Sequence, residues 1–416
     1  MSKLYETEER QERVFLVAVS LSEEEDVEES LKELEELAKT AGAVCVGKVI
    51  QNLDRFHPGT YVGKGKIEEI RTLAYETEAD TIICDDELSP AQLANLNEEL
   101  GIKVIDRTTM ILDIFAARAS TKEGKIQVEL AQLRYRATRL KGLGTSMSRL
   151  GGGIGTRGPG EKKLETDRRL IKERISLLKE ELRNVVKNRE TIRKQRRDKG
   201  LPVIAIVGYT NAGKSTLLNH LTDAGVLEED KLFATLDPTT RNYPLENGQE
   251  LLFTDTVGFI RKLPHHLVDA FRSTLEEAKY ADIILHVVDA SNPACHIQMH
   301  TVYQTLDELG VKDKPVVTAF NKIDKLTEPE TLKDLRADLS ISISAKYGTG
   351  MEELLRGLER ILREQKIYLE RLFPYAEASV LQQIRKNGEL LSEEYQNDGI
   401  LVKAYVPPEL SYLVEK

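Results

Sequence analysis

The chain has 416 residues, of which 40% are hydrophobic and 31% are charged, with a formal net charge of −10. One core seldom grows beyond about 250–300 residues, so we expect two to four domains. The sequence has no run of about 18 apolar residues, which argues against a membrane span, and its charged start differs from a secretory signal. The three cysteines, at 45, 84 and 295, lie too far apart for a disulfide framework or a zinc-ligand spacing. We therefore expect a soluble cytoplasmic protein.

Charge is distributed unevenly along the chain. Residues 1–133 carry 15 basic and 28 acidic side chains, residues 134–199 carry 21 and 8, and residues 200–416 carry 23 and 33. The central basic block favours a polyanionic partner. The alternative is a solvated helix with scattered surface charge.

Residues 1–120 are predicted to form an α/β domain. Apolar runs alternate with segments of helical spacing, beginning with a strand over 13–20 and a helix around 24–41. The further strands are expected at 44–49, 81–84 and 103–105, and the further helices at about 64–78 and 89–100. This alternation is typical of a sheet that is at least partly parallel.

Residues 121–199 are predicted to form a basic helical hairpin. A helix from about 121 runs into a glycine-rich segment at 142–161, and a long basic helix follows from Lys162 to about Lys199. A loop of this length is usually functional or disordered. Its glycines let the backbone fit closely against a partner.

Residues 200–366 are predicted to form a second α/β domain, and residues 367–416 a small C-terminal domain. The turn residues Gly200-Leu201-Pro202 end the preceding helix. Strands are then expected near 203–207, 250–254, 283–288, 315–320 and 340–343, with another at 400–406 in the tail.

A phosphate-binding loop lies within VIAIVGYTNAGKSTLLNHL (203–221), in the required strand–loop–helix context. Glycines let backbone N–H groups point at phosphate oxygens, and the helix N-terminus adds its positive dipole end. Lys214 is expected to reach the β- and γ-phosphates and Ser215 to offer a hydroxyl to Mg²⁺. The expected contacts are Gly208, Tyr209, Thr210, Asn211, Ala212, Gly213, Lys214, Ser215 and Thr216. By contrast, Gly63-Lys64-Gly65-Lys66 lacks the full spacing and is interpreted as a turn before a helix.

Three later segments favour GTP over ATP. Asp255 can hold the Mg²⁺ shell through water, and the Gly258 N–H can meet the γ-phosphate. The Asp324 carboxylate can accept hydrogen bonds from guanine N1–H and the 2-amino group, a pair that adenine lacks. The three segments are 255–258, 321–324 and 344–346. Each follows a predicted strand, and open α/β sheets bind ligands at the carboxyl ends of their strands. The expected contacts are Asp255, Thr256, Val257, Gly258, Asn321, Lys322, Ile323, Asp324, Ser344, Ala345 and Lys346.

The segment FATLDPTTR (233–241) fits a first switch, whose threonine joins Mg²⁺ only when the γ-phosphate is present. Thr235 is the preferred threonine, and Thr239 and Thr240 are the alternatives. The expected contacts with GTP and Mg²⁺ are Phe233, Ala234, Thr235, Leu236 and Asp237.

No catalytic residue is identified. Many GTPases place a water-orienting glutamine after the switch glycine, but this chain has Phe259. We therefore expect slow intrinsic hydrolysis, with the missing group supplied elsewhere or by a partner. His265 and His266 can position water, although solvated residues at a helix start are the simpler interpretation. Asn211 stands where some GTPases hold K⁺, which is a hypothesis.

With these motifs in place, the chain resembles HflX, a family of translation-associated GTPases in the Obg–HflX group. GYTNAGKS, FATLDPTTR, DTVGFI and NKID match the family's GTPase boxes. GLGTSMSRLGGGIGTRGPGE, the long helix after it and YVGKGK match the family's N-terminal half. The resemblance covers essentially the whole chain, with little signal in the tail. It implies the fold class α/β, a P-loop GTPase domain joined to an N-terminal α/β domain, a basic helical hairpin and a small C-terminal domain.

The resemblance also implies a partner. HflX proteins bind the large ribosomal subunit, use the hairpin to reach ribosomal RNA near the peptidyl-transferase centre, and split stalled or idle ribosomes after stress. By this resemblance GTP promotes binding, hydrolysis releases the factor, and the protein is a monomer. The expected RNA phosphate contacts are Arg149, Arg157, Lys162 and Lys163.

Two other functions have less support in the sequence. A GTP-dependent RNA-modifying or RNA-remodelling enzyme would need a second chemical site, and the sequence shows no cysteine nucleophile constellation, metal cluster or second complete nucleotide motif. A small-molecule kinase with a P-loop is disfavoured by the segment 321–324 and by the first-switch segment.

Overall fold

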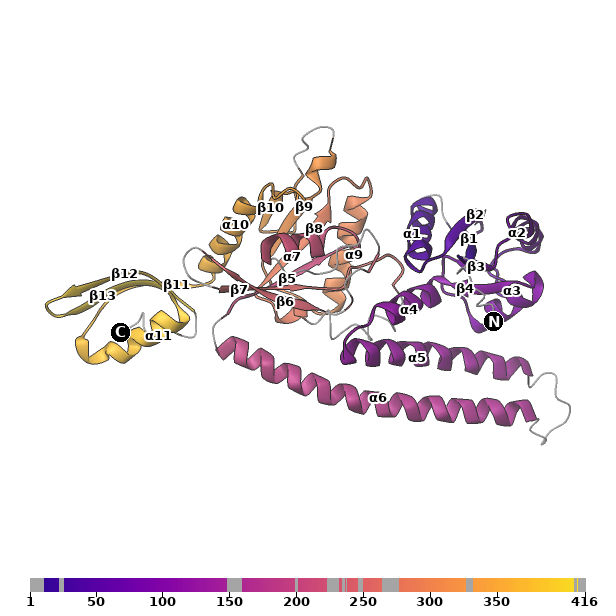
Figure 1. Ribbon diagram of the computed structural model, residues 1–416, viewed down its shortest axis with the longest axis horizontal. Helices are drawn as coiled ribbons and strands as arrows, with labels where there is room; N and C mark the ends of the chain where they lie inside the picture. Colours follow the sequence, from indigo (N-terminus) through magenta and orange to yellow (C-terminus); the bar gives the residue numbers. More distant parts are fainter. Residues whose placement is uncertain are drawn as a thin grey trace, which may run out of the picture. The chain divides into compact units, whose positions relative to one another are not determined.

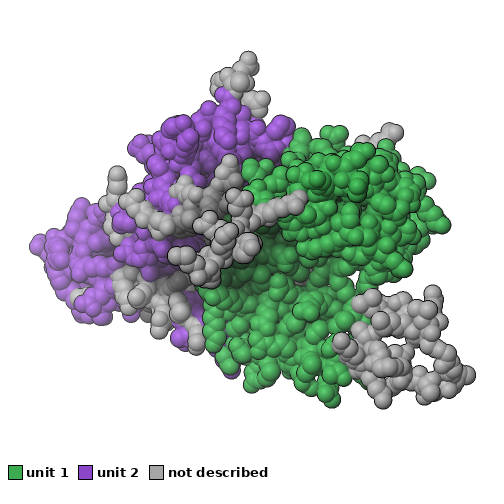
Figure 2. Space-filling view, turned by 45° about the vertical axis from the view of Figure 1, so that its right-hand side comes forward, with its two compact units in different colours: residues 1–184, 229–236, 261–271 green, residues 185–228, 237–260, 272–416 purple. Residues whose placement is uncertain are grey.

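The structure is a computed structural model (Figure 1). It describes residues 11–21, 26–147, 159–198, 201–222, 232–233, 236, 238–245, 250–263, 277–326, 332–407 and 410. Within these ranges, no helix combines the length and apolar character that a membrane crossing requires. The chain divides into two compact units, which are coloured separately in Figure 2. The first contains residues 1–184, 229–236 and 261–271, and the second contains residues 185–228, 237–260 and 272–416.

The first unit contains a four-stranded sheet that is parallel throughout, in the order β2-β1-β3-β4. Its strands are β1 (Arg13–Ser20), β2 (Val44–Asn52), β3 (Thr81–Cys84) and β4 (Lys103–Asp106). Its helices are α1 (Val27–Thr40), α2 (Lys64–Glu76), α3 (Pro90–Leu100) and α4 (Arg107–Arg118). Gly63 is the N-cap of α2, but Lys64, Gly65 and Lys66 form the first turn of the helix, so the interpretation of the whole segment as a turn before a helix was wrong.

Local sequence signals define several ends of these helices. The Ser89 side chain forms a capping box with Gln92, and Pro90 occupies the first turn of α3. The helix α4 was not predicted. Its residues 110–112, 114 and 115 are apolar and all buried, so no polar face reveals a helical period.

The helical hairpin consists of α5 (Lys122–Met147) and α6 (Pro159–Asp198), which run side by side in Figure 1. Ile126 and Leu130 of α5 pack against Leu178 of α6. The predicted glycine-rich break at 142–161 was too long, because α5 continues to Met147 and α6 begins at Pro159. Proline is pre-organised for a first helical position, which explains the earlier start of α6.

The second unit contains a six-stranded sheet in the order β10-β9-β8-β5-β7-β6. Its strands are β5 (Val203–Gly208), β6 (Thr239–Pro244), β7 (Glu250–Asp255), β8 (Ile283–Asp289), β9 (Val316–Asn321) and β10 (Leu339–Ser342). The strand β6 was not predicted, because its polar sequence TTRNYP joins the sheet only by antiparallel pairing with β7 at the edge. The other pairings are parallel.

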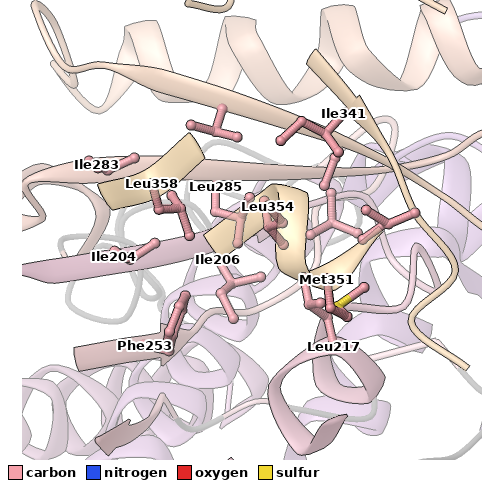
Figure 3. Packing of buried hydrophobic residues seen from close by; sticks show 14 of the residues in the cluster. Ile204, Ile206, Leu217, Phe253, Ile283, Leu285, Ile341, Met351, Leu354 and Leu358 are labelled. Atoms are coloured by element: carbon pink, nitrogen blue, oxygen red, sulfur yellow. The ribbon is translucent and has the colours of Figure 1, made fainter. Parts of the chain in front are cut away.

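The helices of this sheet are α7 (Lys214–Thr222), α9 (Cys295–Glu308), α10 (Met351–Glu364) and the short 3₁₀ helix η1 (Ile323–Lys325). Figure 3 shows Ile206 and Leu285 of the sheet packed with Leu217 of α7 and Leu354 of α10. This core fixes the start of α7 at the carboxyl end of β5, where the nucleotide loop lies.

The described C-terminal part contains an antiparallel sheet in the order β11-β13-β12, a short 3₁₀ helix and an α-helix. Its elements are β11 (Ile367–Phe373), η2 (Tyr375–Glu377), α11 (Ala378–Asn387), β12 (Glu389–Gln396) and β13 (Gly399–Val406). The strand predicted at 400–406 is present. The predicted α/β fold class is confirmed.

Candidate functional site: a guanine-nucleotide site

The phosphate-binding loop connects β5 to α7 and depends on close backbone approach. Gly208 has φ 155°, and a Cβ built there would lie 2.2 Å from the Val287 carbonyl oxygen. Gly213 has φ 95°, and its Cβ would lie 2.2 Å from Asn321 Nδ2. Neither position can hold a side chain without moving its neighbour. Asn211, between them, also has a positive φ, 59°.

Lys214 lies inside this loop. Its Nζ donates to the carbonyl oxygens of Gly208 at 3.2 Å and Tyr209 at 2.8 Å, and the residue is 7% exposed. Burial lowers the pKa of Lys214 to about 8, and the Asp255 carboxylate opposes this shift. A bound polyphosphate would add negative charge around the ammonium and so favour its charged form.

Two oxygen ligands suited to Mg²⁺ lie side by side. The Ser215 hydroxyl, on the first turn of α7, donates to Asp255 Oδ2 at 2.9 Å, and Asp255 is fully buried at the end of β7. Mg²⁺ prefers hard oxygen ligands and keeps several waters, so this pair fits direct binding by the hydroxyl and water-mediated binding by the carboxylate. Thr235, the third expected ligand, lies outside the described residues.

The segment after Asp255 meets the loop directly. A Cβ at Gly258 would lie 2.8 Å from Thr210 Cα and 2.9 Å from Lys214 Nζ. Phe259 is 2% exposed, accepts a hydrogen bond from Thr210 N at 2.8 Å and donates one to the Gly208 carbonyl at 3.1 Å. Phe259 therefore supports the loop through its main chain, and its ring is buried. His265 and His266 lie outside the described residues.

The base-recognition segments also converge on the loop. Asn321 Nδ2 donates to the Ala212 carbonyl at 2.9 Å, and Asn321 Oδ1 accepts from Ala345 N at 2.9 Å. One buried amide thus joins the phosphate loop to the Ser344–Lys346 segment. The Ser344 hydroxyl donates to Asp324 Oδ1 at 2.6 Å, which fixes the orientation of the carboxylate expected to bind guanine.

Sequence reasoning missed Asp289, which ends β8. Its Oδ2 accepts from Lys322 Nζ at 2.7 Å, and the same Nζ donates to the Asn211 carbonyl at 2.7 Å. Lys322 has φ 65°, and its ion pair with Asp289 holds its side chain across the phosphate-binding loop. The available signal was a lone carboxylate at the carboxyl end of a buried strand.

The remaining predicted contacts fall into three groups. The first group lies in the described part of the second unit. Thr256 and Val257 are buried beside the loop, and Thr216 lies on α7. Ile323 begins η1, and the Lys346 ammonium lies over the Tyr347 ring. Phe233 and Leu236 are buried within the first compact unit, so their contact with the nucleotide stays a prediction. The positions outside the described residues are Ala234, Asp237, Arg149 and Arg157, together with the side chains of Lys162 and Lys163.

The alternative switch threonines are placed on a strand. Thr239 and Thr240 begin β6, and the Thr240 hydroxyl lies 3.0 Å from the Thr254 hydroxyl of β7. This sheet contact engages the Thr240 hydroxyl, and the choice among the three threonines stays a prediction.

The assembled loop, oxygen ligands and base-recognition segments, on the carboxyl ends of a mostly parallel sheet, define the class of protein: a P-loop GTPase. Residues 203–322 match the family described as 50S ribosome-binding GTPase. Residues 28–116 match the family described as GTP-binding GTPase N-terminal, and residues 118–196 match the GTP-binding GTPase Middle Region.

Relatives identify the family. A protein named GTPase HflX from Lacrimispora saccharolytica is 66% identical over 410 residues, which cover 99% of this chain and 97% of the relative. The GTPase HflX of Escherichia coli is 42% identical over 393 residues, covering 94% and 89%. A solved GTP-binding protein of Sulfolobus solfataricus, in complex with GDP, is 26% identical and covers 84% of this chain and 98% of its own, with a TM-score of 0.45. The chain belongs to the HflX family of GTPases, which hydrolyse GTP to GDP and phosphate.

Proposed function

We propose that this GTPase binds the large ribosomal subunit in its GTP-bound state and splits stalled or idle ribosomes, and that GTP hydrolysis drives its release. The observation that carries the proposal is the basic hairpin. Its segment 134–199 has 21 basic and 8 acidic residues, and between residues 165 and 187 only Leu178 is fully buried. A helix this exposed and this basic suits RNA phosphates. The description of the family matched by residues 203–322, a 50S ribosome-binding GTPase, agrees with such a partner.

The C-terminal end of α6 supplies a path from the nucleotide to the hairpin. Arg193 Nη2 donates to Glu277 Oε1 at 2.6 Å, and the Arg193 guanidinium lies 4.2 Å from the centre of the Tyr280 ring. Glu277 is 7% exposed and follows the second-switch segment in the sequence. If the second-switch segment moves when the γ-phosphate is present, the contact between Glu277 and Arg193 would therefore pass that movement to α6.

We infer the following roles at the site. Lys214 and the loop amides bind the β- and γ-phosphates, Ser215 and Thr235 bind Mg²⁺, and Asp324 selects guanine. Mg²⁺ neutralises charge on the phosphates when it is bound. Intrinsic hydrolysis is slow and is stimulated by the ribosome, because Phe259 replaces a water-orienting glutamine. The protein acts as a cytoplasmic monomer that is partly ribosome-associated.

Sedimentation with purified ribosomal subunits tests the partner. With a non-hydrolysable GTP analogue, the protein should co-migrate with the large subunit, and with GDP it should not. The double change Arg149→Ala and Arg157→Ala should weaken this binding and lower its salt dependence, because each lost phosphate contact reduces the slope by about one. Binding to free tRNA, with none to the large subunit, would favour an RNA-modifying enzyme instead.

Potassium dependence is a separate part of the proposal. If Asn211 helps to hold K⁺ beside the phosphates, hydrolysis should be faster in potassium than in sodium buffer, and Asn211→Ala should remove the difference. Equal rates in the two buffers would remove potassium from the mechanism.

A further inference from the structure

Thr210 has a buried hydroxyl that the protein itself leaves without a hydrogen bond. The residue follows Tyr209 in the phosphate-binding loop and is 7% exposed. Among the residues that the structure describes, it is the only one whose buried side-chain hydroxyl has no partner. A buried hydroxyl without a partner destabilises the folded protein, so its presence in a ligand-binding loop calls for an explanation.

Two other buried threonines of the second unit show what a structural hydroxyl does. The Thr256 hydroxyl donates to the Ile206 carbonyl at 2.8 Å, and the Thr318 hydroxyl donates to Asp334 Oδ2 at 2.7 Å. Both hydroxyls thereby hold neighbouring parts of the sheet together. The Thr210 hydroxyl has no such structural role.

The main chain fixes the position of Thr210. Its N–H donates to the Phe259 carbonyl at 2.8 Å, and the Phe259 N–H donates to the Gly208 carbonyl at 3.1 Å. These bonds accompany a parallel bridge between Tyr209 and Phe259. The backbone, and not the hydroxyl, therefore keeps the Thr210 side chain in place.

Thr210 lies at the end of the loop that is expected to bind the γ-phosphate. A Cβ built at Gly258 would lie 2.8 Å from both Cα and Cγ2 of Thr210, and 2.9 Å from Lys214 Nζ. The Lys214 ammonium and the Gly258 N–H are the groups expected to meet the γ-phosphate. Because the hydroxyl and the methyl group of threonine branch from one carbon, the Thr210 hydroxyl lies in the same small region.

A γ-phosphate oxygen is the partner whose chemistry and position fit this hydroxyl. A threonine hydroxyl can donate one hydrogen bond, and a phosphate oxygen is a charged acceptor. Hydrogen bonds to charged acceptors are shorter and stronger than those between neutral groups. GDP has no γ-phosphate, so the bond would form with the triphosphate alone.

The residue after the switch glycine makes such a donor relevant to hydrolysis. Phe259 cannot orient a water molecule, and its ring is buried, with the residue 2% exposed. Catalysis without a glutamine there has to depend on groups that stabilise charge on the phosphates. Such groups are most effective when they are fixed before the reaction begins, and the main-chain bonds of Thr210 provide that fixed position.

We propose that the Thr210 hydroxyl donates a hydrogen bond to a γ-phosphate oxygen of GTP and is a catalytic residue in hydrolysis. In this reaction a water oxygen attacks the γ-phosphorus, and the bond from that phosphorus to the β–γ bridging oxygen breaks. The electron pair of the broken bond leaves with GDP, and a proton of the water passes to the released phosphate. Thr210 keeps its own proton and stabilises the charge on the γ-phosphate oxygens. The proposal rests on the nucleotide site proposed above but not on the ribosomal partner.

Single-turnover GTP hydrolysis by the purified full chain, without ribosomes, tests the catalytic role. Thr210→Val replaces the hydroxyl with a methyl group and should lower the rate about tenfold or more, because a fixed donor to the phosphate is lost. Thr210→Ser keeps the hydroxyl and should retain most of the rate. Lys48→Met, at an exposed position on β2, is the surface control and should change nothing.

Affinity and stability separate this role from a general loss of structure. In Thr210→Val, GDP affinity should stay the same, whereas affinity for a non-hydrolysable GTP analogue should fall about threefold to tenfold, as for one lost hydrogen bond. The urea midpoint without nucleotide should not fall, because the removed hydroxyl has no partner in the protein. Thr318→Val is the matched control. It removes a hydroxyl that donates to Asp334, so its urea midpoint should fall.

An unchanged hydrolysis rate in Thr210→Val, with GDP binding intact, would overturn the proposal. Equal losses of GDP and analogue affinity, or a urea midpoint that falls as far as in Thr318→Val, would also overturn it, because the hydroxyl would then support the loop as a whole. Failure of the unmodified protein to bind GDP and the analogue would instead refute the nucleotide site. A slower Thr210→Val in a protein that does not bind the large subunit would support the catalytic role and reject the ribosomal partner.

Discussion

The parallel sheet of the first unit and the mostly parallel six-stranded sheet of the second unit use their carboxyl ends differently. In the first unit, Asp85 and Asp106 at these ends are engaged by side chains of the same protein, including Arg107 and Arg139. In the second unit, glycines bring the backbone close, and Lys214 bonds main-chain carbonyls. The comparison teaches that the carboxyl edge of such a sheet can bind a ligand where main-chain groups line it. Where ion pairs occupy the edge, as in the first unit, the edge holds another segment of the same protein.

The largest effect is expected at the nucleotide loop. Lys214→Ala should weaken GDP binding by about 10³-fold, because a buried cation facing phosphates is lost. Isothermal calorimetry with Mg²⁺ measures the affinity, and Lys48→Met provides the control. Near-normal affinity in Lys214→Ala would remove this lysine from the phosphate site.

The matching change in the first sheet should affect folding instead. Arg107 is 2% exposed, and Arg107→Met would leave the buried Asp85 and the partly buried Glu33 without its guanidinium. Removing one partner of a buried ion pair costs about 3–5 kcal/mol of unfolding free energy. Urea unfolding followed by circular dichroism measures this loss. Arg356→Met, which removes an exposed ion pair on α10, is the control and should change little.

Asp324→Asn sharpens the comparison at the base. An amide cannot accept both guanine hydrogen bonds, so GTP affinity should fall about 10²-fold while xanthosine triphosphate gains. Competition between the two nucleotides measures the change, and Asp398→Asn in the C-terminal sheet is a control. If GTP binds the Asp324→Asn protein as before, Asp324 is not the base contact.

The smallest effect concerns pH and the second sheet. His286 on β8 is 1% exposed, and burial lowers its pKa to about 4 against the opposing charge of Asp334. In the unfolded state His286 binds a proton near the ordinary pKa of histidine, whereas in the folded state it stays neutral. The free energy of unfolding therefore decreases as pH falls. Between about pH 7 and pH 5 the loss is about 2 kcal/mol.

Urea midpoints at a series of pH values measure this dependence. Tyr303 and Thr318 both donate to Asp334 in the same cluster, so the comparison must remove the histidine alone. His286→Gln should flatten the slope over this interval. An equally steep slope in His286→Gln would assign the acid sensitivity to other groups.

Sequence reasoning was most accurate where one short segment carries the whole signal. The strands at 203–207 and 81–84, and the loop before α7, follow from local apolar runs and glycine spacing. The helix α4 and the strand β6 escaped prediction for opposite reasons. The first has a long buried apolar stretch and little polar sequence on its exposed face, and the second is polar and joins the sheet through its pairing with β7.

The candidate site divides in the same way. Local motifs predicted the residues expected to bind phosphate and base, and the structure brings the described ones together through Asn321. Asp289 was missed because its role depends on Lys322, 33 residues further along the chain. Local spacing carries no record of such a pair.

By itself, the sequence determined that this chain has a P-loop GTPase domain, a basic helical block and an α/β N-terminal part, because glycine spacing, charge and hydrophobic period act over short distances. Only the tertiary structure decided that Lys262 and Phe233 belong with the N-terminal residues. Their partners, Asp85, Asp86 and Phe115, lie more than a hundred residues away, and only folding of the whole unit brings these charges and rings into contact.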